Sequence, residues 1–232
     1  MVELKGVSHE YENGVEGLKD VNLKVTDGEF CFIAGRSGSG KSTLSKLLTG
    51  ELRATSGEVR VNGYNMGALK PRSMAEARRT IGMVFQDYRL ISTMTVEENL
   101  EFAMRCVGAS TSEIARRLPE VLELVGLEDK MDSMPSEMSG GEQQRAAIAR
   151  AIINHPLLII ADEPTGNLDP KLAVDIMKLF QRINEMGTTT IVITHARELV
   201  DTFPSRVITL SLGRVVHDAF GRYVGSEEAD GK

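Results

Sequence analysis

Hydrophobic and polar positions alternate near the start of the chain and merge into continuous apolar runs further on. The alternation over residues 2–11 and 17–25 predicts two strands that each bury one face. The runs "EFCFIAG", "LLIIAD" and "TTTIVITH" are apolar with hardly a break, which is typical of strands covered on both faces. We therefore expect strands of two kinds: strands with one buried face near the start of the chain, and strands covered on both faces further on.

Helical spacing of apolar residues replaces this pattern in the middle of the chain. Thr95 and Glu98 have the spacing of a capping box, which predicts a helix along "TVEENLEFAMRCV". The next segment, "SEIARRLPEVLELVG", keeps the helical period. Proline lacks a backbone N–H, so we expect this second helix to be interrupted or kinked at Pro119.

A further helix is expected after Asp169, with Pro170 at its first position and an end at Gly187. Its apolar face consists of Leu172, Ile176, Leu179, Phe180 and Ile183. The segment "RVITLSLGRVVHD" near the C-terminal end predicts a hairpin that turns near Gly213.

Strands that alternate with helices predict an α/β fold with a mainly parallel core sheet. We expect one domain over residues 1–232. The core and an N-terminal antiparallel β-subdomain occupy about 1–86 and 155–220, and an inserted α-helical subdomain occupies about 87–154. The polar end, residues 221–232, is expected to be a flexible tail.

Composition narrows the classes of function. The formal net charge of −6 argues against a nucleic-acid binder held by bulk electrostatics, although a local basic face is compatible with it. No apolar run approaches the roughly 18 residues that cross a bilayer, and Met1 starts no signal peptide, so we expect any membrane role to come through a partner. Cys31 and Cys106 lie in apolar stretches without ligand spacing, which predicts buried free thiols of a cytosolic protein.

The segment "GRSGSGKST" follows a predicted buried strand, precedes a predicted helix and fits the phosphate-loop pattern G-x-x-x-x-G-K-[ST]. A flexible surface turn is the alternative, but it does not account for this context. Backbone N–H groups of such a loop surround phosphates, Lys41 reaches the β- and γ-phosphates, and the Ser42 hydroxyl binds Mg²⁺. The predicted phosphate-binding residues are Gly35, Arg36, Ser37, Gly38, Ser39, Gly40, Lys41, Ser42 and Thr43.

Two carboxylates stand at the end of the run "LLIIAD". Asp162 ends this strand and is placed to hold Mg²⁺ through water. Glu163 follows at once and points elsewhere, because side chains alternate along a strand. A carboxylate beside the γ-phosphate that is no metal ligand can polarise an attacking water. The alternative is that the pair only caps the next turn.

Three other polar or aromatic residues follow predicted strands. Parallel strands direct their C-terminal ends to one crevice, so His195 can donate to the γ-phosphate or orient Glu163, although a lone histidine there is more often structural. Gln86 can orient water and coordinate Mg²⁺ weakly. Tyr11 can stack on a base, with ordinary packing as the alternative.

The segment "MSGGEQQR" predicts a second helix start that suits an anion. Ser139 and Glu142 have the spacing of a capping box, and two glycines leave the backbone bare between them. Free N–H groups at a helix N-terminus attract phosphate. The chain therefore has two phosphate-facing helix starts.

These motifs together resemble the ATP-binding cassette family along nearly the whole chain. They are "GRSGSGKST", Gln86, "SGGEQQR", "LLIIADEPTGNLD" and His195, in that order. The resemblance implies an ATPase of the phosphate-loop class that uses ATP and Mg²⁺. It implies that Tyr11 stacks on adenine, that Gln86 links the γ-phosphate to the helical subdomain, that Glu163 is the catalytic base and that His195 is the switch histidine. Residues 167–169, which include Asp169, correspond to the D-loop. Met138 departs from the family's usual leucine with little expected effect.

The resemblance also implies an assembly. Two cassettes of this family meet head to tail, so Ser139, Gly140 and Gly141 would face the nucleotide of a second copy, and a homodimer forms when ATP binds. An integral-membrane partner would dock on the helical subdomain near residues 86–94, which places the chain peripherally on the cytoplasmic face of the membrane. No nucleic-acid partner is expected.

Within the family, "FQDYRLI" and the C-terminal hairpin are most similar to ATPase subunits of cell division. Subunits of lipoprotein-release and macrolide-export transporters share "ADEPTGNLD" and are the alternative. Soluble cassettes that act on DNA or ribosomes are less favoured, because here one cassette holds its motifs in a compact stretch. A kinase is disfavoured because no feature points to an acceptor site.

Overall fold

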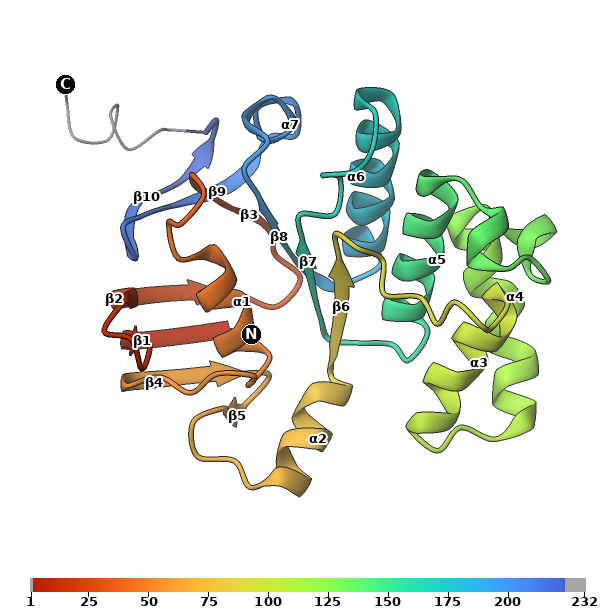
Figure 1. Cartoon of the computed structure of the whole chain (residues 1–232), viewed down its shortest axis with the longest axis horizontal. Coiled ribbons are helices and arrows are strands. Elements are labelled where there is room, and N and C mark those ends of the chain that lie inside the picture. Colours follow the sequence, from red (N-terminus) through yellow and green to blue (C-terminus); the bar gives the residue numbers. More distant parts are fainter. Residues whose placement is uncertain (1, 224–232) are drawn as a thin grey trace.

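The computed structural model describes residues 2–223, and Met1 and residues 224–232 lie outside the described part. Two sheets with helices around them form the molecule (Figure 1). The strands are β1 (Val2–Glu10), β2 (Glu16–Val25), β3 (Phe30–Ala34), β4 (Ser56–Val61), β5 (Tyr64–Asn65), β6 (Ile81–Phe85), β7 (Leu158–Asp162), β8 (Thr189–Thr194), β9 (Ser205–Ser211) and β10 (Arg214–Gly221). The helices are α1 (Lys41–Leu48), α2 (Pro71–Arg79), α3 (Val96–Cys106), α4 (Thr111–Val125), α5 (Gly140–Ile152), α6 (Pro170–Glu185) and α7 (Arg197–Thr202), with the 3-10 turns η1 (Glu128–Lys130) and η2 (Pro135–Glu137).

The larger sheet has the strand order β10–β9–β3–β8–β7–β6 and is parallel except for its edge strand β10. The smaller sheet, β2–β1–β4–β5, is antiparallel. The prediction of an α/β fold with a mainly parallel core sheet, an N-terminal antiparallel part and inserted helices is therefore confirmed.

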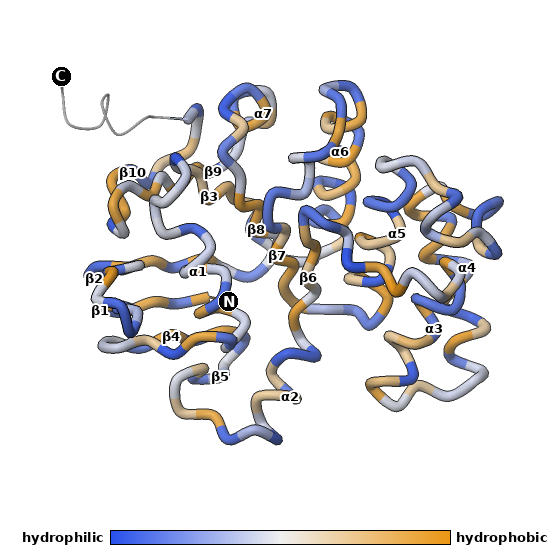
Figure 2. The backbone as a smooth tube through the Cα atoms, viewed as in Figure 1, coloured by the Kyte–Doolittle hydropathy of each residue, from blue (hydrophilic) through white to orange (hydrophobic). Residues whose placement is uncertain are grey.

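The three continuous apolar runs form β3, β7 and β8, in the interior of the larger sheet. Their side chains alternate between two cores: Phe32 and Ile159 face the core shared with α3 to α6, whereas Ile33 and Ile160 face the core shared with α1 and the antiparallel sheet. Hydrophobic stretches of β6 and β7 occupy the centre of the molecule (Figure 2). Burial on both faces explains why these strands show no alternation.

The predicted starts of the helices after Thr95 and Asp169 are confirmed. The Thr95 hydroxyl accepts from the Glu98 N–H at 3.2 Å, and Glu98 Oε2 accepts from the Thr95 N–H at 2.8 Å. Asp169 Oδ1 accepts from two N–H groups of the first turn of α6, which begins at Pro170. Each cap satisfies donors that the helix itself leaves unpaired.

Two predictions are wrong in part. Helix α4 is not interrupted at Pro119: it runs from Thr111 to Val125, and Leu118 and Val121 beside the proline are buried in the core. Cys106 is exposed, whereas Cys31 is buried in β3. Cys106 is the last residue of α3 and lies two positions beyond the buried Met104, which turns its side chain away from the buried stripe.

Two helices, α2 and α7, were not predicted from the sequence. Helix α2 has few apolar residues and buries only Met74 and Ala77, and α7 has only six residues, so neither offers a long apolar pattern. In the predicted tail, Gly221 ends β10 and the Tyr223 N–H donates to Asp201 Oδ1 on α7 at 2.8 Å; residues 224–232 lie outside the described part. Between residues 2 and 223, no helix is both long and apolar enough to span a membrane.

Candidate functional site

The glycine-rich loop connects β3 to α1 at the C-terminal edge of the larger sheet. Gly38 has φ +77°, and open space lies where a Cβ would point. Gly40 has φ +106°, and a Cβ there would lie 2.6 Å from the carbonyl oxygen of Gly17. Glycine is therefore required at position 40 by close backbone approach as well as by conformation.

Lys41 lies folded over this loop. Its Nζ donates to the carbonyl oxygens of Gly35 at 2.8 Å and Arg36 at 3.0 Å. Burial lowers the pKa of Lys41, and the nearby carboxylates of Glu163 and Asp162 act against that shift. Ser39 Oγ is buried without a hydrogen-bond partner among the described residues. A cationic amine in a bare backbone loop fits the oxygens of a triphosphate.

Asp162 ends β7 beside this loop. In the sheet it pairs with Phe85 of β6 and Ile193 of β8. Burial raises the pKa of Asp162 and the neighbouring Glu163 raises it further, while Lys41 lowers it. Asp162 and Ser42 line the same cavity, and a carboxylate with a hydroxyl supplies the oxygen donors that Mg²⁺ prefers.

Glu163 and His195 meet across 32 residues of sequence. Glu163 has φ 48°, and its N–H donates to the carbonyl oxygen of Ile193 at 2.8 Å. This left-handed turn, rather than strand alternation, aims the side chain at the end of β8. There Glu163 Oε1 lies 2.7 Å from His195 Nδ1, and Oε2 accepts from the Thr194 hydroxyl at 3.1 Å. The Glu163 side chain is 17% exposed and the His195 ring 66% exposed.

A cavity of about 430 Å³ brings most of the predicted site residues together. Its lining consists of Tyr11, Val15, Glu16, Gly17, Ser37, Gly38, Gly40, Lys41, Ser42, Thr43, Asp162, Glu163 and His195. The Tyr11 hydroxyl lies 2.9 Å from the Thr43 hydroxyl, which positions the aromatic ring at one end of the phosphate loop. Gly35, Arg36 and Ser39 belong to the loop but do not line this cavity.

An adjoining cavity, also of about 430 Å³, holds all three predicted magnesium ligands. It is lined by Ser42, Phe85, Gln86, Asp87, Arg89, Asp162, Glu163 and Asn167. The Asn167 amide donates to the Gln86 carbonyl oxygen at 3.0 Å, and the Gln86 amide donates to Asn167 Oδ1 at 3.4 Å. The segment that follows β6 is thereby joined to the segment that follows β7.

The signature residues lie apart from both cavities. The capping box is confirmed: the Ser139 hydroxyl accepts from the Glu142 N–H at 3.3 Å, and Glu142 Oε2 accepts from the Ser139 N–H at 2.8 Å. The hydroxyl and N–H of Ser139 lower the pKa of Glu142 to about 2, and Lys130 forms an ion pair with it. Ser139, Gly140, Gly141 and Asp169 line neither cavity.

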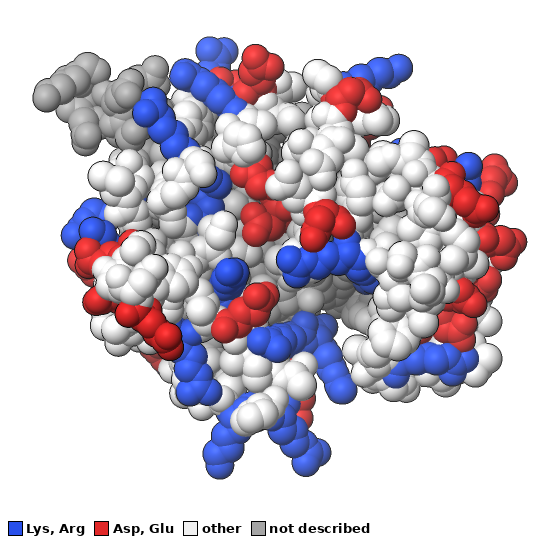
Figure 3. Space-filling model, in the orientation of Figure 1, with Lys and Arg blue, Asp and Glu red and all other residues white. Residues whose placement is uncertain are grey.

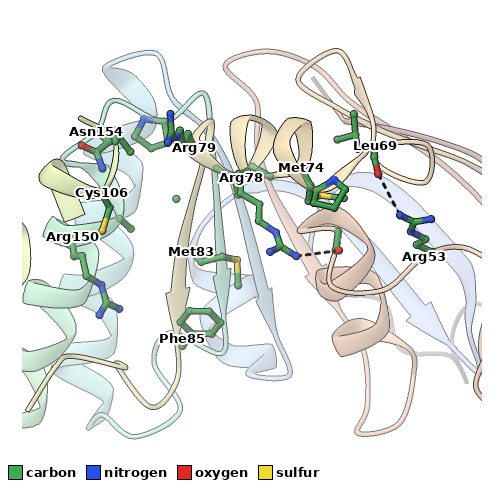
Figure 4. A pocket seen from close by; sticks show the side chains of 18 residues that line it. Arg53, Leu69, Met74, Arg78, Arg79, Met83, Phe85, Cys106, Arg150 and Asn154 are labelled. Carbon is green, nitrogen blue, oxygen red and sulfur yellow. Dashed lines mark hydrogen bonds between the residues drawn. The ribbon is translucent and has the colours of Figure 1, made fainter. Parts of the chain in front are cut away.

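A larger groove of about 820 Å³ is lined by residues of α2, β6, α3 and α5 (Figure 4). Its apolar lining includes Met74, Met83 and Phe85, and Cys106 opens into it. Basic side chains also line it: Arg53, Arg78, Arg79 and Arg150. The sequence did not predict this groove, because its lining comes from segments far apart in the chain.

Arg150 contacts the segment that follows Gln86, and the sequence did not predict it as a functional residue. Its guanidinium donates to the carbonyl oxygens of Tyr88 and Arg89, in the segment directly after Gln86. The available signal was one basic residue inside the apolar stretch "AAIARAI". Only the fold shows what this residue reaches.

Known proteins are similar to this chain in sequence and in fold. Residues 18–166 match the family model described as ABC transporter. The chain belongs to the ABC transporter family. As a member of this family of ATP-binding cassettes, the protein is an ATP hydrolase that binds ATP with Mg²⁺, as the sequence predicted.

Relatives and solved structures cover almost the full length of the chain. Proteins named cell division ATP-binding protein FtsE are 49% identical in Mycobacterium tuberculosis (94% of this chain, 95% of that protein), 43% in Bacillus subtilis (94% and 96%) and 41% in Escherichia coli (93% and 97%). The finer resemblance of "FQDYRLI" and the C-terminal hairpin is to this group, and it is confirmed.

Among solved structures, the cassette MJ0796, described as a dimer in a post-hydrolysis state bound to ADP and Pi, has a TM-score of 0.85 at 37% identity. That match covers 97% of this chain and 100% of the other. The cassette cbiO1 from Clostridium perfringens has a TM-score of 0.88 at 30% identity, covering 94% of this chain and 87% of the other.

Proposed function

We propose that this protein is an FtsE-type ATPase that drives an integral-membrane partner of the FtsX type in cell division, from the cytoplasmic face of the membrane. The observation that carries the proposal is 41–49% identity to FtsE proteins over at least 93% of the chain. ATP-driven movement would pass through the partner to cell-wall remodelling outside the membrane.

In this proposal, Lys41 and the loop amides hold the phosphates, and Ser42, Asp162 through water, and Gln86 hold Mg²⁺. When bound, the cation neutralises charge on the phosphate oxygens. Glu163 accepts the proton of the attacking water. Its contact with His195 at 2.7 Å supports a role for the histidine in orienting the base.

The signature acts in trans in this proposal. Ser139 caps an exposed helix start and lies outside the cavity that holds Lys41, so one copy has both halves of a site in different places. A second copy, arranged head to tail, would bring its Ser139, Gly140 and Gly141 to the first copy's nucleotide. The dimer described for MJ0796 bound to ADP and Pi supports this arrangement.

The groove between α2, β6, α3 and α5 is the proposed docking site for a cytoplasmic segment of the partner. It adjoins the segment at residues 86–94 that the sequence favoured, and Phe85 of its lining directly precedes Gln86. An apolar floor with a polar rim is the form of groove that receives a partner helix.

The two cysteines allow a direct test. Cys106 opens into the groove, whereas Cys31 is fully buried and burial raises its pKa, so a maleimide should modify only Cys106. Modification of Cys106 in the isolated protein should slow when the FtsX-type partner, purified in detergent, is added. Mass spectrometry of the two thiol peptides measures this protection, with Cys31 as the internal control. Equal labelling with and without a partner that co-purifies with the chain would contradict docking in the groove.

A further inference from the structure

The surface around α2 is basic, although the whole chain carries a formal net charge of −6. Five exposed basic residues make up this surface, which we call the α2 basic face: Arg53, Lys70, Arg72, Arg78 and Arg79. Residues 70–79 contain four of them and one acidic residue, Glu76. Figure 3 shows Lys and Arg side chains gathered over the region of α2.

The charges of the α2 basic face are largely uncompensated. Over residues 2–223, the one ion pair of this face joins Arg72 to Glu76 at 3.9 Å. The Arg72 side chain is 95% exposed, so solvent weakens this pair. Arg78 donates to the carbonyl oxygens of Thr49 and Gly50, and Arg53 donates to that of Leu69, so these bonds hold the guanidinium groups without neutralising them. The face therefore keeps a net positive charge.

The backbone beneath these charges is firmly held. Met74 and Ala77 are buried on the inner side of α2. The opposite side presents Arg72, Glu76 and Arg79, at the spacing of one helical face. The basic side chains thus extend from a fixed element into solvent.

The same face is poor in exposed apolar side chains. In the described part of the chain, the large hydrophobic residues that are exposed lie elsewhere: Val15, Phe102, Leu157, Met186, Leu212, Val216 and Phe220. Protein interfaces usually centre on aromatic or aliphatic anchors that fill pockets. A lipid headgroup layer requires only positive charge within about a Debye length.

From these observations we infer that the α2 basic face binds the anionic headgroups of a phospholipid bilayer. The inference rests on the proposed function in one respect: the groove proposed for the membrane partner directly adjoins α2, so this face would look toward the bilayer. The acidic balance of the rest of the surface would repel anionic lipid, and it would thereby orient the ATPase with its groove toward its partner.

Co-sedimentation of the isolated protein with vesicles tests this inference. The protein should bind vesicles that contain about 30 mol% phosphatidylglycerol but not vesicles of phosphatidylcholine alone, and the binding should weaken as salt is raised to about 0.5 M. The variant Lys70→Gln/Arg72→Gln removes two charges that do not line the groove. It should lower the partition coefficient about 25-fold, since each basic residue near an anionic surface contributes about fivefold.

The matched control is Lys171→Gln/Lys178→Gln, which removes the same charge from exposed positions on α6. It should bind vesicles like the unmodified protein, and circular dichroism should show both variants folded. Equal binding to both vesicle compositions, or equal binding by both variants, would overturn the inference.

Protection of Cys106 measures docking of the partner, and co-sedimentation with vesicles measures lipid binding, so the two proposals are tested separately. In detergent without anionic lipid, Lys70→Gln/Arg72→Gln should keep the protection of Cys106 by the partner. Loss of that protection would assign these residues to the partner protein and overturn the lipid assignment. Vesicle binding without any Cys106 protection would instead contradict the proposed docking groove and leave the lipid contact standing.

Discussion

Arg150 Nη2 donates to the main-chain carbonyl oxygen of Tyr88 at 2.8 Å. Tyr88 and Arg89 both have left-handed backbone conformations, with φ 58° and 49°, which L-residues rarely adopt. The Arg150 guanidinium also donates to the Arg89 carbonyl oxygen, so one side chain holds both strained residues. A Cβ on Gly140 would lie 3.0 Å from the Tyr88 hydroxyl. The segment after Gln86 is therefore held against α5 near both ends of that helix.

We expect Arg150→Lys to lower kcat for ATP several-fold with little change in KM. Lysine cannot donate to two carbonyl oxygens from one planar group, so the segment after Gln86 would loosen while the phosphate loop stays intact. The free energy of unfolding should fall by about 2 kcal/mol, measured in urea, since hydrogen bonds from a charged donor are lost. Arg116→Lys, on the exposed side of α4, is the control. A rise in KM alone would assign Arg150 to nucleotide binding instead.

Glu163→Gln should keep ATP binding and slow hydrolysis by about 10²- to 10⁴-fold, the range that a general base contributes. Glutamine has nearly the same size and can still contact His195, but it cannot accept the proton of water. Because the variant binds ATP without hydrolysing it, it should elute as a dimer in size-exclusion chromatography with ATP and Mg²⁺ and as a monomer without nucleotide. A monomer under both conditions would count against the head-to-tail site.

Two variants that are each inactive should restore activity when mixed. Lys41→Ala removes the phosphate-loop amine, and Ser139→Arg places bulk and charge where the signature would meet the partner's phosphate. A heterodimer of the two contains one complete site, formed by the intact loop of the Ser139→Arg chain and the intact signature of the Lys41→Ala chain. ATP hydrolysis by the mixture should exceed the sum of the separate rates. If it merely equals that sum, the signature does not act in trans.

Glu142→Gln should lower the free energy of unfolding at neutral pH, and this effect should vanish in acid. The folded protein lowers the pKa of Glu142 to about 2 from its usual 4.5, because Ser139 donates two hydrogen bonds to the carboxylate. Stabilisation by a carboxylate of lowered pKa is fully present above about pH 4.5 and is lost as the pH falls toward 2.

Urea unfolding at about pH 7, 5, 4 and 3.5 measures the free energy of unfolding of the variant and of the unmodified protein across that titration. The difference should be largest at neutral pH and should narrow below about pH 4.5. Glu128→Gln, at an exposed carboxylate in η1, is the matched control for the loss of one negative charge. A difference for Glu142→Gln that stays constant with pH would show that the capping carboxylate is not the cause.

The sequence by itself determined the features that depend on neighbouring residues. The phosphate loop at residues 35–43, the doubly covered strands and the capping boxes at Thr95 and Ser139 each follow from local backbone geometry and burial pattern. The ends of the strands β7 and β8 could also be located, and with them Asp162, Glu163 and His195 as residues of one crevice. Local rules failed where packing overrides them, as in α4 at Pro119.

Only the tertiary structure decided how distant segments meet. It brought Glu163 to His195 by a left-handed turn, joined Arg150 to Tyr88 across 62 residues, and opened the groove that exposes Cys106. It also concentrated the positive charge of α2 on one surface of an acidic protein. Strand order and helix packing create these contacts, and they arise from the simultaneous burial of apolar faces on segments far apart in the chain. Neither the spacing nor the composition of any one segment contains that information.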